Sequence, residues 1–354
     1  MKIIQRLYIK DFLKLLSLLA AGLSLIFSLL DMIDKIGSLA PGRSSAADLM
    51  LYVSYNIPKY FLYLLPMSVL ICSLFTFSQA FRRKEITAIK SAGGRMKTLL
   101  YPFIAMGVLL SLFAFITGEF VVPQCSKKAS DLKNTLEGKG RKLNITDGGL
   151  WLRSKDGSPV RIEIYSGEKR AAKGISIFVL GRDSLIEKIL AEKASWDGNA
   201  WVLEDVTRYR VETGKIESLK TLVYAGLESP DFFTDELRGA GEMGIVELYR
   251  YMQRLKNAGF KNAKLAVDLQ SKISFPLVSL FMMLLGISLS LRVNLGGGLF
   301  SAGLGLLISL CYWFGYTFSL SMGYAGVVPA LLSAWTIPSV FGLLSVYLFA
   351  GMPE

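Results

Sequence analysis

Six stretches of the chain are long and apolar enough to cross a lipid bilayer, and this feature constrains the fold most strongly. An α-helix rises about 1.5 Å per residue, so roughly 20 apolar residues span the hydrocarbon core. Hydrophobic residues make up 52% of the 354 residues, which favours a polytopic α-helical membrane protein over a soluble one. The six spans are expected at residues 12–33, 57–81, 98–122, 273–291, 299–320 and 327–349.

The segment between the third and fourth spans, residues 124–244, differs in character. Charged residues are frequent there, and Val160, Ile162 and Ile164 alternate with more polar neighbours. Such alternation predicts β-strands, and Asp-Gly pairs predict the turns between them. The pairs are Asp147-Gly148, Asp156-Gly157 and Asp197-Gly198. We therefore expect an inserted antiparallel β domain, a sandwich or a jelly-roll-like fold. Residues 1–123 then hold spans one to three, and residues 245–354 hold a connecting helix and spans four to six.

The loop between the second and third spans, residues 82–97, is strongly basic. Its cations are Arg82, Arg83, Lys84, Lys90, Arg95 and Lys97. Short basic loops stay in the cytoplasm, so the loop is expected on the cytoplasmic side with both termini, and the β domain on the opposite side.

Within this elbow, a short helix is expected to present one apolar face to another protein. Ile86, Ile89 and Ala92 recur at helical spacing, and the glycine pair that begins at Gly93 supplies a helix stop. Glu85 is the lone acid. The alternative is a solvated loop whose charges only anchor the helices.

Composition argues against several classes of function. The chain has no histidine, its three cysteines lack metal-ligand spacing, and no G-x-x-x-x-G-K-[ST] phosphate loop occurs. No paired buried carboxylates and no nucleophile–base pair stand out, so neither an enzyme, a metal site nor a cofactor is expected in this chain. The net charge of +12 gathers largely where it sets membrane topology, which does not indicate nucleic acid.

A few ionisable residues lie near the ends of the spans opposite the elbow. Lys35, Arg43 and Lys59 are candidates to meet an anionic lipid head group. Glu119 is expected to reach the membrane interface with its carboxylate.

Three groups of motifs resemble the lipopolysaccharide-export permeases, the LptF/LptG family. They are Ile57-Pro58-Lys59 with Pro66-Met67, the elbow from Arg83-Lys84-Glu85-Ile86 to Ala92-Gly93, and Gly118-Glu119 with Val122-Pro123-Gln124. The resemblance covers essentially the whole chain. Gly149-Leu150-Trp151 and Gly174-Ile175-Ser176-Ile177 are closer to the LptG branch of the family than to the LptF branch.

The resemblance implies a transmembrane subunit of an ABC transporter that extracts lipopolysaccharide from the bacterial inner membrane. The implied partners are an LptF-like permease subunit, an LptB-like ATPase dimer that binds ATP and Mg, and LptC/LptA-like bridge proteins in the periplasm. The β domain would be a periplasmic β-jellyroll, and the first and fifth helices would form lateral gates.

The resemblance also implies roles for particular residues. The elbow would be a coupling helix in which Glu85 contacts an arginine of the ATPase, with Arg83, Ile86, Ile89, Ala92 and Gly93 around it. Lys59 matches a family position directly. The chain departs from the family at the end of the first helix, where Asp31 stands at a position expected to be lysine and Lys35 is shifted by about a turn.

Two other functions fit the same pattern. One is an ABC-type permease for another amphiphile, such as a lipoprotein. The other is a membrane scaffold without transport activity whose β domain binds a partner. Co-purification with an ATPase separates both permeases from the scaffold, and mass spectrometry of bound lipid separates the two permeases.

Overall fold

The computed structural model describes most of the chain and divides it into two compact units. The first comprises Met1–Glu137, Ala240–Leu248 and Ala263–Glu354, and the second Gly138–Gly239 and Tyr249–Asn262. The predicted boundaries at residues 124 and 245 both fall inside the first unit. The described residues are 2–36, 45–93, 96–136, 144–146, 149–154, 156–166, 170–180, 185–211, 214–227, 229–230, 240–257, 262–292 and 297–351.

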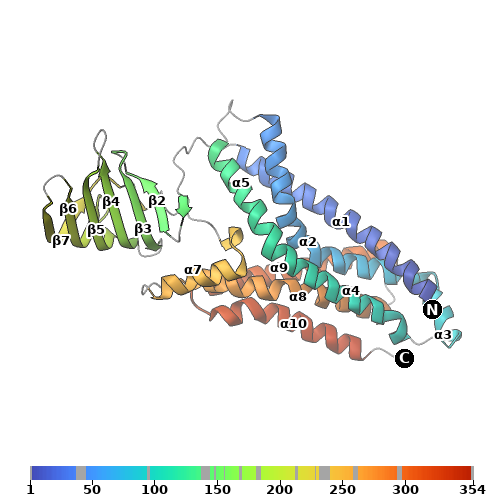
Figure 1. Cartoon of the computed structure of the whole chain (residues 1–354). Coiled ribbons are helices and arrows are strands. Elements are labelled where there is room, and N and C mark those ends of the chain that lie inside the picture. Colours follow the sequence, from blue (N-terminus) through green and yellow to red (C-terminus); the bar gives the residue numbers. More distant parts are fainter. Residues whose placement is uncertain are drawn as a thin grey trace. The chain divides into compact units, whose positions relative to one another are not determined.

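The first unit is a bundle of long helices (Figure 1). Six helical stretches of the described residues are long and apolar enough to cross a membrane, as predicted. The start of α1, the short helix α3 and the end of α10 lie at one end of the bundle. The helices are α1 (Lys2–Ile36), α2 (Ala46–Arg82), α3 (Glu85–Ser91), α4 (Met96–Ile116), α5 (Val122–Leu136), α8 (Ala263–Arg292), α9 (Gly298–Tyr324) and α10 (Ala330–Ala350). Helix α7 (Ile245–Asn257) begins in the first unit and continues in the second.

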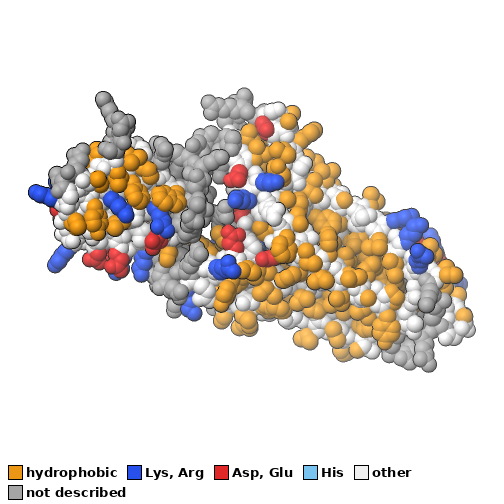
Figure 2. Space-filling model, viewed as in Figure 1, with side chains coloured by type: hydrophobic (Ala, Val, Ile, Leu, Met, Phe, Trp, Pro, Cys, Tyr) orange, Lys and Arg blue, Asp and Glu red, His pale blue; other side chains and the backbone are white. Residues whose placement is uncertain are grey.

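Helices α2 and α8 form the centre of the bundle. In the most apolar stretch of each, 61% of the residues are buried, against 22% in α1 and 28% in both α9 and α10. At Gly286 of α8, an added Cβ would lie 2.7 Å from Ser73 Cβ of α2, so only glycine permits this close approach. Apolar side chains cover much of the bundle surface in Figure 2. Apolar surface of this extent requires lipid or partner helices around α1, α9 and α10.

Helix α2 begins earlier than predicted, at Ala46 rather than near residue 57. Ser45 and Asp48 form a capping box: the Ser45 Oγ accepts from the Ala47 N–H, and Asp48 Oδ2 accepts from the Ser45 N–H at 3.2 Å. These bonds satisfy backbone donors that a helix start leaves free. Residues 46–56, which lie before the expected second span, therefore belong to the same helix.

The third membrane helix does not end just before Pro123, contrary to the prediction. Helix α4 passes through the π turn η1 (Thr117–Val121) directly into α5, and the apolar span extends over Thr98–Lys133. In this wider turn the Val122 N–H donates to the Thr117 carbonyl. Proline has no N–H to donate and disturbs the preceding turn, so a π turn just before Pro123 lets the helix continue.

The second unit is an antiparallel β domain, as predicted. Its strands follow one another in a single sheet of order β1-β2-β3-β4-β5-β6-β7. Asp156-Gly157 and Asp197-Gly198 lie in turns, whereas Asp147-Gly148 lies outside the described residues. The strands are β1 (Asn144–Thr146), β2 (Gly149–Arg153), β3 (Pro159–Ser166), β4 (Ala171–Leu180), β5 (Leu185–Trp196), β6 (Trp201–Arg210) and β7 (Ile216–Tyr224).

This sheet is rolled onto itself around its own core. Strands β2 and β7 are five positions apart, which in a flat sheet is about 24 Å. Yet the Ser154 Oγ, just after β2, lies 3.1 Å from the Tyr224 OH of β7. The Tyr165 and Trp201 rings of β3 and β6 also meet, with centroids 6.4 Å apart. The roll is thus jelly-roll-like in shape, but its strands run up and down in sequence order and do not form a sandwich of two sheets.

Gly174 changes which side chains of β3 and β4 face the core. At Gly174 the backbone φ is +66°, a left-handed conformation that favours glycine. Before this point Ile162 is buried, but beyond it Tyr165 is buried, although alternation predicted an outward Tyr165. The strict two-residue period therefore fails where the backbone leaves the β region.

Candidate functional site

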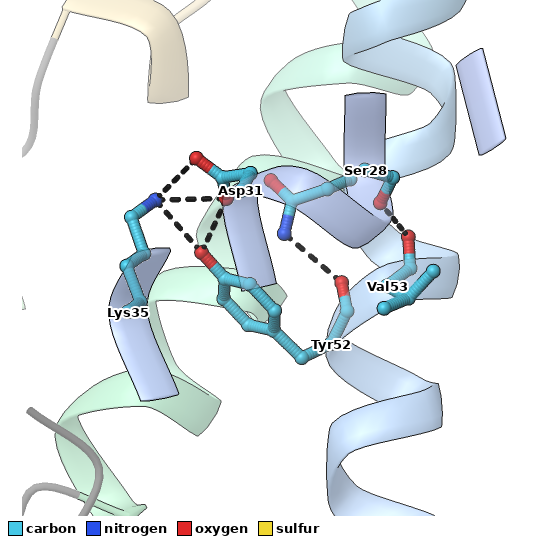
Figure 3. Close-up of polar contacts among 6 residues, drawn as sticks. Ser28, Asp31, Lys35, Tyr52 and Val53 are labelled. Atoms are coloured by element: carbon cyan, nitrogen blue, oxygen red, sulfur yellow. Dashed lines mark hydrogen bonds and ion pairs between the residues drawn. The ribbon is translucent and has the colours of Figure 1, made fainter. Parts of the chain in front are cut away.

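A polar clamp joins α1 to α2 at the end of the bundle opposite α3 (Figure 3). Asp31 and Lys35 are four residues apart on α1, so their side chains share one face of the helix. The Lys35 Nζ donates to Asp31 Oδ1 at 2.8 Å and to the Tyr52 OH of α2 at 2.9 Å. The Tyr52 OH donates to Asp31 Oδ2 at 2.9 Å, and the Ser28 Oγ donates to the Val53 carbonyl at 2.7 Å. We call these five residues the α1–α2 clamp.

The clamp changes how the predicted head-group cations are interpreted. The ammonium group of Lys35 is held by its own chain, and Asp31, the departure from the family pattern, is the acid that holds it. Lys59 differs, because its Nζ lies over the Tyr60 ring, 5.3 Å from the centroid, and forms no ion pair or hydrogen bond with the described residues. Arg43 lies outside the described residues. The head-group role stays a prediction for all three.

The elbow places the lone acid beside the first helix. Arg83 and Lys84 form the turn between α2 and α3, with Lys84 at φ +56°. The Tyr8 OH of α1 donates to Glu85 Oε2, and Arg83 Nη1 lies 3.9 Å from Glu85 Oε1. The Glu85 side chain keeps 40% of its surface exposed. Part of this carboxylate is therefore free for a further contact.

Contrary to the prediction, the apolar face of α3 does not point outward. Ile86 is only 3% exposed, and it belongs to the cluster that includes Tyr8, Phe12 and Phe77, with Ile89 against the same cluster. The amphipathic pattern therefore docks α3 on its own bundle. Among the elbow residues whose burial the structure describes, the exposed ones are instead small or basic: Arg82, Arg83, Lys84, Thr87, Ala88, Ser91, Ala92 and Gly93.

Gly93 ends the elbow helix as predicted. Its φ is +74°, and the last backbone bond of the helix runs from the Ala92 N–H to the Ala88 carbonyl at 3.1 Å. A left-handed residue just beyond a helix is the usual glycine stop.

Glu119 is not simply an interfacial side chain, contrary to the prediction. Its Oε2 accepts from the Ile245 N–H, the first residue of α7, at 2.6 Å. A Cβ on Gly244 would lie 2.7 Å from Glu119 Oε1, so the glycine leaves room for the carboxylate. The acid thus caps a helix start that lies 126 residues further along the chain.

These contacts tie both ends of α1 to the bundle. The α1–α2 clamp holds one end, and Tyr8 with Gln5, whose Nε2 donates to the Thr98 carbonyl at 2.7 Å, holds the other. Between them lies an apolar cavity of about 350 Å³ between α1 and α2. Beside this cavity α1 packs on the bundle through a stripe of buried residues that includes Phe12, Leu16 and Ala20. The sequence does not single out Tyr8 or Tyr52 as contact residues. The only signal is that each tyrosine lies a few residues before an expected apolar span.

Taken with the fold, these features define a class of protein. Six membrane-length helices, a β domain inserted after the third and a basic elbow after the second are those of a multi-pass membrane protein with an inserted β unit. Residues 6–351 match the family described as "Lipopolysaccharide export system permease LptF/LptG". The chain belongs to this family.

The chain is also similar to a protein of Haemophilus influenzae named "Lipopolysaccharide export system permease protein LptG". The two are 24% identical over 332 residues, which cover 91% of this chain and 88% of the relative. The resemblance inferred from the motifs is confirmed at the level of the family.

Proposed function

We propose that this chain is the transmembrane subunit of an ABC transporter that extracts lipopolysaccharide from the bacterial inner membrane and passes it to a periplasmic bridge. The observation that carries the proposal is the family match over residues 6–351. An LptF-like permease subunit would cover the exposed apolar faces of α1 and α9. An LptB-like ATPase dimer would bind ATP and Mg and dock on the elbow. The chain itself would have no catalytic centre.

The sparse burial of α1 suits the movement that the proposal requires. In its most apolar stretch only 22% of the residues are buried, against 61% in α2 and α8, so α1 would be the helix to open sideways as a lateral gate. The rolled β unit would receive the lipid from the membrane and pass it to LptC/LptA-like proteins.

The proposal requires the elbow in the cytoplasm and the β unit in the periplasm. In a variant with its native cysteines replaced, a cysteine at Ser91 should resist an impermeant thiol reagent added to spheroplasts, and one at Ser218 should react. Both positions are exposed, so burial does not protect either of them. Labelling at Ser91 from outside would contradict this topology.

Substitutions of Lys59 test whether the substrate carries a phosphate that this lysine binds. A lysine–phosphate hydrogen bond contributes about 1.5–3 kcal/mol, so Lys59→Glu should reduce lipopolysaccharide crosslinking and release about ten- to hundredfold, and Lys59→Arg much less. The measurement is release of lipopolysaccharide from vesicles that contain the assembled complex. Mass spectrometry of the co-purified lipid decides the substrate. A lipoprotein in its place would mean another permease, and a lack of any ATPase or lipid would mean a scaffold.

A further inference from the structure

The chain rejoins the helical unit after the β strands through residues 240–248, which we call the return segment. It holds the short 3-10 turn η2 (Ala240–Glu242) and the first turn of α7. Two apolar side chains anchor it, because Met243 is only 5% exposed and Leu248 is fully buried. The polar anchor is Glu119, whose carboxylate accepts from the Ile245 N–H.

The cap of α7 has to come from elsewhere in the chain, because the residue before this helix is a glycine. The Gly244 carbonyl accepts from the Leu248 N–H at 2.9 Å and so begins the helix. Gly244 has no side chain that could accept from the free N–H groups of the first turn. A Cβ at this position would lie 2.7 Å from Glu119 Oε1. The first turn of α7 therefore depends on a carboxylate from another helix.

Glu119 lies in the middle of the π turn η1. Single π turns inside α-helices occur frequently at functional positions. The residues beside it, Gly118 and Val122, line a cavity of about 180 Å³ between α2, α4, α8 and α9, and so do Ile245 and Lys272. Open space thus lies among these groups, which leaves the carboxylate room to move between them.

Lys272 on α8 is a second partner within electrostatic range of this carboxylate. Its ammonium group is subject to the charges of Glu119 and Asp268, yet it forms no ion pair or hydrogen bond with the described residues. Asp268 Oδ1 accepts from the Tyr324 OH at 2.7 Å. The Lys272 side chain is half-buried, and an ammonium group in a membrane helix is costly unless an anion or water meets it. Glu119 therefore has two partners to choose between and occupies one of them.

We propose that Glu119 is a two-position latch, which holds the return segment on the bundle by capping α7 and releases it by pairing with Lys272. A charged helix cap and a partly exposed ion pair are similar in strength, so a small displacement of α8 shifts the balance between them. Glu119 is thus a positioning residue for the connection between the membrane helices and the β strands. The inference requires neither lipid nor ATPase, so it stands or fails separately from the proposed function.

Hydrogen–deuterium exchange of the purified full chain in phosphatidylcholine nanodiscs measures the latch. Peptides that cover residues 243–250 report whether α7 is capped. Glu119→Ala should speed their exchange about tenfold, because the Ile245 N–H loses its acceptor and the first turn its cap. Lys272→Gln should slow their exchange roughly three- to tenfold, because it removes the competing partner and with it the released population. Slower exchange is the opposite of what structural damage would cause.

Two further variants separate the latch from a fixed cap. Glu119→Gln keeps an acceptor for the Ile245 N–H but carries no charge for Lys272, so the addition of Lys272→Gln should change nothing further. Lys264→Gln, at an exposed site about two turns earlier on α8, should exchange like the wild type. Unchanged exchange in Lys272→Gln would mean a fixed cap, and faster exchange would mean that the lysine supports the cap. Either result would overturn the proposal, as would equal slowing by Lys264→Gln.

Discussion

Trp201→Ala is expected to unfold the β unit while the membrane helices remain folded. Trp201 is fully buried at the start of β6, with its ring centroid 5.6 Å from that of Trp196. Removal of a buried tryptophan side chain costs about 3–5 kcal/mol. A domain of about 100 residues is stable by only about 5–15 kcal/mol, so a large share of this stability would be lost. The β unit is compact by itself, so its unfolding need not spread to the helices.

Limited proteolysis of the full chain in detergent measures this effect. The β unit of Trp201→Ala should be cut at temperatures at which the wild-type unit is protected, and Trp201→Phe should show a smaller loss. Trp313→Ala is the matched control, because Trp313 on α9 is 51% exposed and contributes little to any core. Equal protection of the wild type and Trp201→Ala would mean that the sheet does not close around this residue.

The membrane helices could be predicted from sequence because hydropathy and length depend only on neighbouring residues. Their ends could be predicted less well. The capping box of Ser45 and Asp48 is readable in the sequence, but it lies outside the span that hydropathy predicts. The π turn before Pro123 carries no simple sequence signal, so the sequence places the end of the third span at residue 122.

Strand alternation was reliable only where the backbone stays extended. It predicted Val160 and Ile162 on the buried face correctly. It failed at Tyr165, because Gly174 on the paired strand adopts a positive φ. Asp205, with φ +53°, interrupts β6 in the same way: Leu203 and Val206 are both buried although they are three positions apart, an odd spacing that strict alternation forbids.

The sequence pointed to several residues of the candidate site, but it did not predict which of them contact each other. Glu85 and Gly93 were identified correctly as the acid and the stop of the elbow helix. The partner of Glu85, Tyr8, lies 77 residues away, and nothing local in the sequence brings the two together. Asp31 and Lys35, by contrast, have the spacing of an intrahelical pair, so their contact was readable.

Glu85 is expected to couple the permease to its proposed ATPase through charge. Its carboxylate is 40% exposed beside Arg83, and one oxygen already accepts from Tyr8. A charged hydrogen bond to an arginine of the partner would contribute about 1.5–3 kcal/mol. Glu85→Gln, which keeps an acceptor for Tyr8 but loses the charge, should therefore weaken ATPase association roughly ten- to hundredfold. Glu85→Arg, which adds a cation beside Arg83, should weaken it further.

Tyr8→Phe distinguishes this role from a purely structural one. If Glu85 mainly holds α3 against α1, Tyr8→Phe should be as harmful as Glu85→Ala, and Glu85→Gln should be mild. If the charge contacts the ATPase, Tyr8→Phe should leave association nearly intact. The measurements are co-purification yield, ATPase rate and lipid release, with the membrane level of each variant as the control for folding. Glu85→Arg combined with the reciprocal arginine-to-glutamate change in the ATPase should restore part of the association, because the two side chains then carry opposite charges again.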